Sequence, residues 1–548
     1  MERKISRRRL NTSAAALATG VAITGSLARH TRALAQSDAT PAASPAAEFA
    51  GLPPEFEDPT NWPVEGANVH ATRQAAETSI SKETISQLGL GWTTPIETSG
   101  GYGALVGPPI VAGDIVYQQD GASNVIALDK ATGEVLWTKT YDTAPPSGGP
   151  NGVAVAYGRV FYSEGLGTVH AIDALTGEDI WETDKLIGPL EEGICMAPLV
   201  YDGVVYISTI PGSLEGFYLP GQRGIFFALD AATGDVLWYW ETTTDNLWGN
   251  PRVNSGGGLW HPPSVDEDGH IFLPVANAAP YPGVEGWPNA SSRPGDNPYT
   301  NNLVSLDIET GQLEWTYSIT GRDIFDLDNH LSPIPVTLEI SGSEREIVIQ
   351  SGKHGIVVAA DAHTGDELWR TLVGKHQNDT LTEIPEGEEI EVFPGTQGGV
   401  ETPIGYADGV VYVPVVNSPS YATSTSIISG QRALGEATGQ LVAIDATNGN
   451  ILWDVTTASP LYGGASIAND VVFSAGLDGI VRGFDTATGE QVFTYQASAG
   501  INTSLTISGD YLLVPAGTVI FASAETPDPA PEYAPSLTAL KIGGDPIA

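Results

Sequence analysis

The residues of this chain that could do chemistry stand outside a conspicuous internal repeat. Asp326 and Asp328 lie two residues apart in GRDIFDLDNHLSPIP (321–335), and Trp260 directly follows the glycines of NSGGGLW (254–260). Carboxylates are the ligands that hard cations prefer, and a glycine run lets backbone or a ligand approach closely. Cys195 is the only cysteine, so the chain has neither an internal disulfide nor a Cys-x-x-Cys-His motif for haem. Redox chemistry would therefore need a bound cofactor and an external electron acceptor.

The repeat itself is an Asp, then Thr-Gly or Asn-Gly three and four residues later, then Trp or Phe at eight. Its seven copies are Asp129/Trp137, Asp173/Trp181, Asp230/Trp238, Asp307/Trp315, Asp361/Trp369, Asp445/Trp453 and Asp485/Phe493. In each copy an apolar strand ends at the Asp, whose side chain caps a turn, and the Gly supplies a positive φ. The next strand ends at an aromatic residue suited to burial between sheets. We therefore assign the repeat Asp residues to structure and none to a metal site.

A second hairpin precedes each copy, as in TPIGYADGVVYVPVV (402–416). Two hairpins make a four-stranded antiparallel blade, and radial repetition of blades is a β-propeller. The last hairpin, SLTISGDYLLVPAG (504–517), and the strand Leu537–Ile542 lack a closing aromatic, which LGLGWTTPI (88–96) supplies from the other end of the chain. The sequence thus predicts an all-β, eight-bladed propeller with an N-terminal strand in the C-terminal blade. Extra length at 239–302 and 370–440 predicts loops on one face, often the binding face.

The N-terminal segments indicate export. Residues 1–35 are predicted to be a signal peptide, because SRRRL (6–10) precedes the small apolar run AAALATGVAITGSLA (14–28) and Ala33-Leu34-Ala35 fits a cleavage site. The arginines resemble a twin-arginine signal, which predicts a periplasmic or extracellular location. An ordinary secretory leader and a retained anchor are the alternatives. Residues 36–60 are predicted to be a flexible Pro/Ala-rich linker, and residues 61–548 to form the propeller domain.

The net charge of the chain restricts the kinds of partner that it can bind. It carries 24 Lys and Arg against 66 Asp and Glu, a formal net charge of −42, and removal of the basic leader makes the mature chain more negative still. Such a surface repels nucleic acid and anionic lipid, and argues against both as partners. No apolar stretch of the mature part is long enough to predict a membrane span.

The repeat resembles the tryptophan-docking motif of the pyrroloquinoline quinone (PQQ) dehydrogenases, eight-bladed propellers that oxidise alcohols or sugars. The resemblance extends from NWPVEGANVHATR (61–73) to LLVPAG (512–517). It is strongest in three segments outside the repeat: DNLWGNPRVNSGGGLWHPP (245–263), VANAAPYPGVEGWPNASSRPGDNPYT (275–300) and GRDIFDLDNHLSPIP (321–335). It implies a dehydrogenase that moves hydride from a small hydroxyl substrate to PQQ. It also implies a Ca²⁺ or lanthanide ion beside PQQ, and electron transfer to an external carrier such as a cytochrome c.

The resemblance also implies roles for residues at matching positions. Trp260 would be the aromatic floor beneath PQQ, and Asp326 the base that removes the substrate's hydroxyl proton. Lys353, in SGKHGIV, falls where the family places an Arg or Lys over the quinone. Each has a structural alternative: Trp260 could be a packing aromatic, and Lys353 a solvated hairpin residue.

The implied metal ligands are Asp326 with Asn277 and Glu215, and Glu215 would also border the cofactor. Asp328 falls where lanthanide-using members carry a second Asp, an extra carboxylate that offsets the charge of a trivalent ion. As alternatives, Asn277 could cap a turn, Glu215 could be an exposed loop carboxylate, and Asp328 could cap a turn or face water.

Several residues depart from the family pattern. Arg322 replaces a usual His, where it could pair with Asp326 or Asp323 and lower the basicity of that carboxylate. VANAA replaces Gly-x-Gly-Asn-Pro around Asn277, Val400-Glu401 replaces Asn-Trp, and an adjacent Cys pair is missing. Two functions stay open: an exported PQQ- and metal-dependent dehydrogenase, and a non-catalytic propeller that acts as a binding or assembly scaffold.

Overall fold

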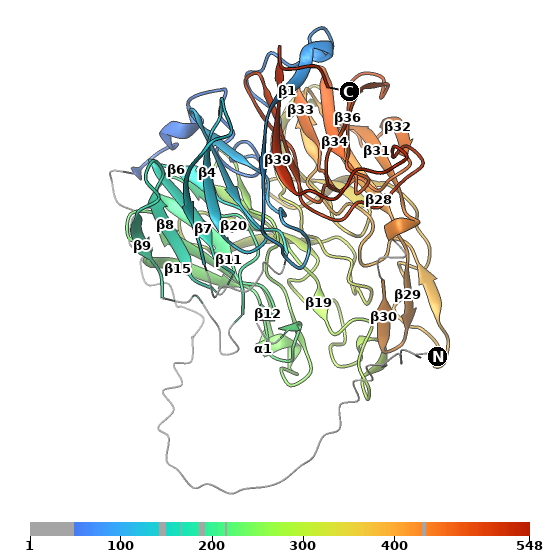
Figure 1. Ribbon diagram of the computed structural model, residues 1–548. Helices are drawn as coiled ribbons and strands as arrows, with labels where there is room; N and C mark the ends of the chain where they lie inside the picture. Colours follow the sequence, from blue (N-terminus) through green and yellow to red (C-terminus); the bar gives the residue numbers. More distant parts are fainter. Residues whose placement is uncertain are drawn as a thin grey trace, which may run out of the picture. The chain divides into compact units, whose positions relative to one another are not determined.

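The computed structural model describes residues 49–141, 149–165, 167–184, 186, 192–213, 216–429 and 434–547. The leader, residues 36–48 of the predicted linker and Glu215 lie outside the described residues. The described chain contains eight four-stranded antiparallel sheets, together with three smaller sheets (Figure 1). This is the all-β, eight-bladed propeller that the repeat predicts. We number the blades 1 to 8 in chain order.

Within each of blades 1 to 7 the strands follow one another along the sheet in chain order. Blade 1 is β2 (Ile110–Ala112), β3 (Ile115–Gln119), β4 (Val125–Asp129) and β5 (Val135–Lys139), and blade 2 is β6 (Ala154–Ala156), β7 (Arg159–Ser163), β8 (Val169–Asp173) and β9 (Asp179–Glu182). Blade 3 is β10 (Leu199–Tyr201), β11 (Val204–Ser208), β14 (Ile225–Asp230) and β15 (Val236–Glu241), and blade 4 is β17 (Ser264–Val265), β18 (His270–Val275), β20 (Asn302–Asp307) and β21 (Leu313–Ser318).

The second half of the chain continues the same pattern. Blade 5 is β22 (Ile334–Ile340), β23 (Ser343–Gln350), β24 (Ile356–Asp361) and β25 (Glu367–Leu372), and blade 6 is β27 (Gly405–Ala407), β28 (Val410–Asn417), β31 (Thr438–Asp445) and β32 (Ile451–Thr457). Blade 7 is β33 (Ser466–Ala468), β34 (Val471–Ala475), β35 (Ile480–Asp485) and β36 (Gln491–Gln496), and blade 8 is β37 (Thr506–Ser508), β38 (Tyr511–Ala516), β39 (Ser536–Ile542) and β1 (Leu88–Pro95). First strands of neighbouring blades contact one another, as β2 contacts β6 and β33 contacts β37. The first strands are therefore the inner ones.

The repeat aromatics join each blade to the next. Trp369 of blade 5 donates its indole N–H to the carbonyl of Ala446 in the blade 6 turn at 2.9 Å. Gly449 of the same turn has a φ of +76°, and a Cβ there would lie 2.8 Å from the Trp369 ring, so this position needs glycine. Asp445 caps the turn by accepting the Thr447 N–H at 2.9 Å. The conspicuous Asp, Gly and Trp of the repeat thus have structural roles.

Strand β1 supplies the outer strand of blade 8. It pairs antiparallel with β39, with Trp92 opposite Ala539. The Trp92 indole N–H donates to the Lys130 carbonyl of blade 1 at 2.8 Å, and a Cβ on Gly133 would lie 2.5 Å from its ring. Trp92 therefore makes the contact between blades 8 and 1 that the repeat aromatics make elsewhere.

The described part of the predicted linker differs from the prediction. Residues 54–56 form a 3-10 helix, η2 (Pro54–Phe56), that packs against blade 2. The Glu55 carboxylate accepts the backbone N–H groups of Tyr157 at 2.8 Å and Gly158 at 2.6 Å, and the Phe49 ring lies 4.7 Å from that of Tyr157. Because these contacts hold it on a blade, residues 49–60 are not a free tether.

Among the described elements outside the blades, the long insertions carry two of the three smaller sheets and two of the four short helices. The insertion in blade 4 contains α1 (Asp245–Trp248), β16 (Ser255–Gly256) paired with β19 (Ala278–Ala279), and η4 (Pro288–Ala290). The one in blade 6 contains β26 (Ile390–Val392), β29 (Ser420–Thr423) and β30 (Ser426–Ile428). Blade 3 adds the hairpin of β12 (Gly212–Ser213) and β13 (Gly216–Phe217), and η3 (Ile85–Gln87) precedes β1. None of the helices in the described part of the chain has the length and apolar character needed to cross a membrane.

We expect Trp369→Ala to lower the free energy of unfolding by about 3–5 kcal/mol, because it empties a buried inter-blade contact. Trp369 is buried and its indole hydrogen bond is lost with it. Thermal and urea unfolding would measure the change. Trp287→Ala is the control, since Trp287 is exposed and lies outside the repeat. Equal stability of the two variants would contradict the structural role of the repeat aromatic.

Candidate active site

A cavity of about 600 Å³ lies where the inner strands of the blades meet. Its lining comes from the segments that precede the first strands of seven of the eight blades among the described residues, which include Val106, Asn151, Trp260, Asp326, Thr402, Tyr462 and Ser504. Because first strands are the inner ones, these segments converge around the propeller axis. The volume falls within the roughly 300–1,000 Å³ that is common for small-molecule sites.

Four of the predicted site residues meet at this cavity, where Asp326, Asp328 and Lys353 line the wall and Asn277 contacts both carboxylates. The Asn277 side-chain amide donates to Asp326 Oδ1 at 2.8 Å, and its backbone N–H donates to Asp328 Oδ1 at 2.8 Å. Lys353 Nζ lies 2.7 Å from Asp328 Oδ2 and 3.4 Å from Asp326 Oδ2. The predictions of an exposed Asp328, a turn-capping Asn277 and a solvated Lys353 are therefore wrong. All four side chains belong to one cluster, which we call the acid–lysine cluster.

A tight loop between β21 and β22 presents the two carboxylates. Asp323 accepts the backbone N–H groups of Phe325 at 2.8 Å and Leu327 at 3.0 Å, and Asp326 between them has a φ of +65°. A positive φ is uncommon for a residue with a side chain and occurs often at functional sites. The loop thus turns Asp326 and Asp328 toward the same partner, Lys353.

Burial dominates the electrostatics of the cluster. It raises the pKa of Asp326 well above its ordinary value; Lys353 opposes this rise, and the neighbouring Asp328 adds to it. Burial disfavours the Lys353 ammonium, but Asp326, Asp328 and Glu401 outweigh it and raise the pKa of Lys353 well above its ordinary value. Burial also raises the pKa of Glu401 to about 8. One lysine therefore faces a local excess of carboxyl groups.

Trp260 lines the same cavity. Its six-membered ring packs against Gly149, where a Cβ would lie 2.8 Å from Trp260 Cζ3. Close backbone packing requires glycine just before Trp260. A Cβ on Gly258 would lie 2.5 Å from the Thr209 carbonyl oxygen, and a Cβ on Gly224, the glycine that faces it, would lie 2.0 Å from Gly258. The glycines thus allow the close backbone packing that fixes the chain immediately before the indole.

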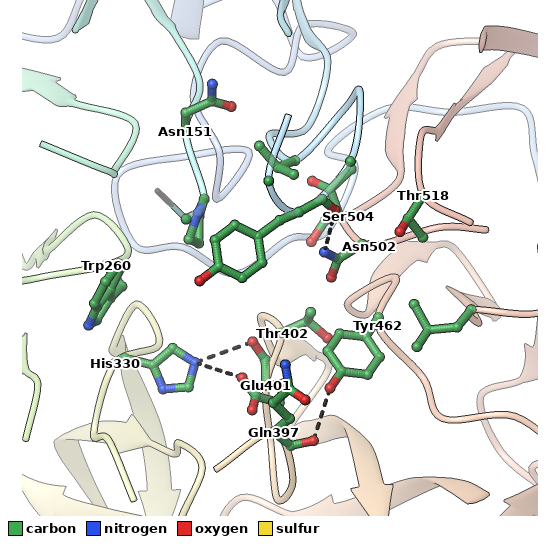
Figure 2. A pocket seen from close by; sticks show the side chains of 18 of the residues that line it. Asn151, Trp260, His330, Gln397, Glu401, Thr402, Tyr462, Asn502, Ser504 and Thr518 are labelled. Atoms are coloured by element: carbon green, nitrogen blue, oxygen red, sulfur yellow. Dashed lines mark hydrogen bonds and ion pairs between the residues drawn. The ribbon is translucent and has the colours of Figure 1, made fainter. Parts of the chain in front are cut away.

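Two histidines in the cavity wall were not predicted. His330 Nε2 lies 3.2 Å from the Glu401 carbonyl oxygen (Figure 2). His261 Nδ1 lies 2.6 Å from Glu65 Oε1, and the two imidazole rings are 5.6 Å apart. Burial, with His261 nearby, lowers the pKa of His330 to about 3, so its imidazole is neutral. Each histidine follows a predicted site residue closely in the sequence, as Trp260-His261 and Asp328-Asn329-His330. This proximity in the sequence was the one signal that could have indicated them.

Two further sequence expectations have an outcome. Arg322 makes no ion pair with Asp326 or Asp323 among the described residues and donates instead to the Asn289 carbonyl. The side chain that pairs with the Asp326 carboxylate is instead Lys353. Glu215 lies outside the described residues; Tyr218, three residues later, donates its hydroxyl to Asn277 Oδ1 at 2.9 Å.

The donor set fits a hard cation. The carboxylate oxygens of Asp326 and Asp328, from one loop, and the amide oxygen of Asn277, from another, are ligands of the type that such ions prefer. Glu401 Oε1 is shielded from solvent and accepts no hydrogen bond among the described residues. The cavity volume and the Trp260 indole fit a planar cofactor, and Lys353 supplies a positive charge for its anionic groups. The residues present are thus compatible with PQQ and a metal ion.

The fold and this site define an eight-bladed propeller with a polar axial cavity and a buried acid–lysine cluster. A family model described as the glucose/ethanol/alcohol dehydrogenase beta-propeller domain, a PQQ family, matches residues 188–375. A second model, outer membrane protein assembly factor BamB, matches residues 59–139 and 353–526.

Curated relatives and solved structures agree with the first model. A quinohemoprotein alcohol dehydrogenase of Comamonas testosteroni is 24% identical over 80% of this chain and 70% of the relative. A 1-butanol dehydrogenase (cytochrome c) of Thauera butanivorans is 26% identical over 80% of this chain and 71% of the relative. The crystal structure of the Comamonas enzyme has a TM-score of 0.75 at 23% identity, covering 89% of this chain and 81% of its own. A europium-containing methanol dehydrogenase has a TM-score of 0.74 at 20% identity, covering 89% of this chain and 99% of its own. By these comparisons the chain is similar to the PQQ-dependent, alcohol dehydrogenase-like propellers.

Proposed function

We propose that the chain is an exported dehydrogenase that oxidises an alcohol or a related hydroxyl compound with PQQ and a metal ion held in the axial cavity. An external acceptor such as a cytochrome c would take the electrons. The observation that carries this proposal is the acid–lysine cluster, because three separate loops meet there: one carries Asp326 and Asp328, one carries Asn277 and one carries Lys353. A scaffold that had lost the chemistry would have no need for buried carboxylates around one lysine.

Trp260 and Lys353 are the residues that would hold the cofactor, by stacking and by charge respectively, with Glu215 at its border. When bound, PQQ supplies a two-electron acceptor, and the metal ion supplies Lewis acidity. Asp326, Asn277 and Glu215 would hold the metal, with Asp328 as an additional carboxylate. The burial of Asp328 within the cluster favours a lanthanide over Ca²⁺, because a trivalent ion needs the extra negative charge.

The chain's own residues would manage the proton. Asp326 is the base, and its carboxylate accepts the hydroxyl proton of the substrate. Asn277 fixes the rotation of that carboxylate through the 2.8 Å bond to Oδ1, which leaves Oδ2 on the side of Lys353. Lys353 opposes the rise in the pKa of Asp326 that burial causes, and so favours the ionised form that a base requires. Trp260 and Tyr462 form part of the cavity wall around the cluster.

We expect the purified chain to bind PQQ in an absorbance titration when Ca²⁺ or La³⁺ is present. Trp260→Leu should weaken this binding by at least about tenfold, because it removes the largest flat surface of the cavity wall. Trp287→Leu, outside the cavity, is the matched control. Absence of PQQ binding with either metal would overturn the dehydrogenase proposal and leave the scaffold reading.

A further inference from the structure

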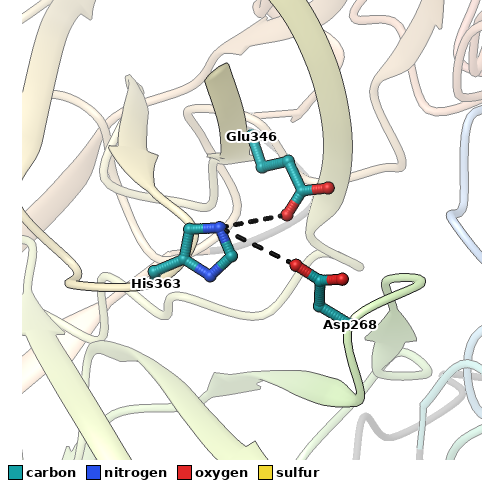
Figure 3. Close-up of side chains that lie close together, drawn as sticks. All are labelled: Asp268, Glu346 and His363. Carbon is teal, nitrogen blue, oxygen red and sulfur yellow. Dashed lines mark ion pairs between the residues drawn. The ribbon is translucent and has the colours of Figure 1, made fainter. Parts of the chain in front are cut away.

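A second cluster of potential metal ligands lies away from the axial cavity, where blades 4 and 5 meet. Asp268 is in the turn between β17 and β18 of blade 4, Glu346 is on β23, and His363 is in the turn between β24 and β25 of blade 5. Figure 3 shows the three side chains pointing toward one another. One ligand atom from each, an imidazole nitrogen and two carboxylate oxygens, lies within 4.8 Å of the others.

The distances suit one small ion. His363 Nε2 lies 3.2 Å from Glu346 Oε2 and 3.9 Å from Asp268 Oδ2. Zinc takes nitrogen and oxygen ligands at about 2.0–2.2 Å in a tetrahedral arrangement, which separates ligand atoms by about 3.3–3.6 Å. The observed separations straddle that range, so small side-chain rotations would complete the geometry. Solvent would supply the remaining ligand, because His363 and Asp268 are about half exposed, at 48% and 56%.

A second observation points to a cation at this place. Glu346 Oε2 is shielded from solvent and has no hydrogen-bond donor among the described residues, although it faces His363 Nε2 at 3.2 Å. The two groups form an ion pair when the imidazole is protonated; when Nε2 carries no proton, both atoms present lone pairs to the same point. A metal ion would satisfy both.

The surroundings add imidazole and negative charge. The His270 ring meets the His363 ring edge to face at 5.3 Å, and His270 Nδ1 lies 2.6 Å from Asp266 Oδ2. Glu314 Oε2 lies 3.7 Å from His270 Nε2. Two histidines are thus surrounded by four carboxylates, a set of ligand types that suits zinc-like divalent ions better than Ca²⁺.

The position of His363 in the repeat sets this cluster apart. The second residue after the repeat Asp is Ala, Leu, Ala, Glu, His, Thr and Ala in blades 1 to 7, so blade 5 alone carries a metal-binding imidazole in this turn. The turn itself is maintained by Asp361, whose Oδ1 accepts the His363 N–H at 3.1 Å. The imidazole is therefore presented by a rigid structural turn toward the neighbouring blade.

We propose that Asp268, Glu346 and His363 bind a divalent transition-metal ion of the zinc class, which ties blade 4 to blade 5. The site is separate from the axial cavity and does not depend on the proposed dehydrogenase activity. The bound ion joins ligands from two blades, so its free energy of binding adds to the stability of their contact.

The test titrates Zn²⁺ alone into untagged, chelator-treated protein in competition with a chromophoric chelator, and follows thermal unfolding in parallel. We expect one high-affinity equivalent and a raised midpoint of unfolding. His363→Ala and Glu346→Gln should weaken this binding at least about tenfold and abolish the rise in midpoint. Glu344→Gln, on the same strand but exposed and outside the cluster, is the matched control and should bind as the wild type does.

Asp326→Asn separates this site from the axial cluster and should keep the Zn²⁺ equivalent. The proposal is overturned if the wild type binds no Zn²⁺, or if His363→Ala and Glu346→Gln bind it with wild-type affinity. Loss of the equivalent in Asp326→Asn alone would also overturn it, because the ion would then belong to the axial cavity.

Discussion

Asp326→Asn is expected to lower the kcat of dye-linked alcohol oxidation by about 10²–10⁴-fold in protein reconstituted with PQQ and Ca²⁺ or La³⁺. Asparagine has the size of aspartate but accepts no proton from a substrate hydroxyl. Asp326 is buried beside Lys353 and Asn277. Asp323 fixes its place in the loop by accepting the backbone N–H groups of its two chain neighbours, Phe325 and Leu327. Steady-state kinetics with an artificial electron acceptor would measure the effect.

The control for this variant is Asp445→Asn. Asp445 caps a repeat turn of blade 6 and lies outside the cavity, so activity should be unchanged. Metal content and PQQ absorbance must be measured on the same samples, because Asp326 is proposed both as base and as ligand. If Asp326→Asn still binds PQQ and metal and turns over at the wild-type rate, Asp326 is not the base.

The fold could be predicted from the sequence because the repeat writes the same local chemistry seven times. The Asp caps a turn and the Gly supplies a positive φ, and in the six copies that end in Trp the indole is suited to the contact with the next blade, as at Asp445, Gly449 and Trp369. The eighth aromatic, Trp92, was found because one blade lacked one. Local signals suffice when structure repeats.

The candidate site was predictable in part. Asn277, Asp326, Asp328 and Lys353 were placed by their resemblance to a family, and their convergence in the structure agrees with that placement. The ion pair of Lys353 with both carboxylates could not be foreseen, because it depends on where two loops meet. For the same reason the Glu65–His261 contact, between residues 196 positions apart, left no pattern in the sequence.

The structure changes the interpretation of two sequence features, the glycines before Trp260 and Arg322. The glycines before Trp260 looked like space for a ligand, but Gly224 and Gly258 are glycine because their backbones touch. Arg322 looked like a competitor for Asp326, but its guanidinium bonds to Asn289 in the η4 segment of the blade 4 insertion. In both cases the chain neighbour of a residue was known and its spatial neighbour was not.

Lys353→Met is expected to destabilise the metal-free protein by about 3–5 kcal/mol, because it leaves the buried Asp326 and Asp328 carboxylates without a counter-ion. Lys353 Nζ is 2.7 Å from Asp328 Oδ2 and 3.4 Å from Asp326 Oδ2, and both carboxylates are buried. A hard cation bound by the same oxygens would replace the lost charge. Added La³⁺ should therefore raise the midpoint of thermal unfolding more in Lys353→Met than in the wild type.

Two variants control for the loss of a long side chain and for the loss of charge. Lys375→Met removes a lysine whose ammonium lies 5.3 Å from the Phe393 ring, away from the acid–lysine cluster, and should respond to La³⁺ as the wild type does. Lys353→Arg keeps the charge and should stay near wild-type stability. If metal-free Lys353→Met unfolds at the wild-type temperature, the lysine does not hold the two carboxylates together. If La³⁺ raises the midpoint of the wild type and Lys353→Met equally, the carboxylates do not form the cation site, because a shared site makes lysine and metal compete for the same negative charge.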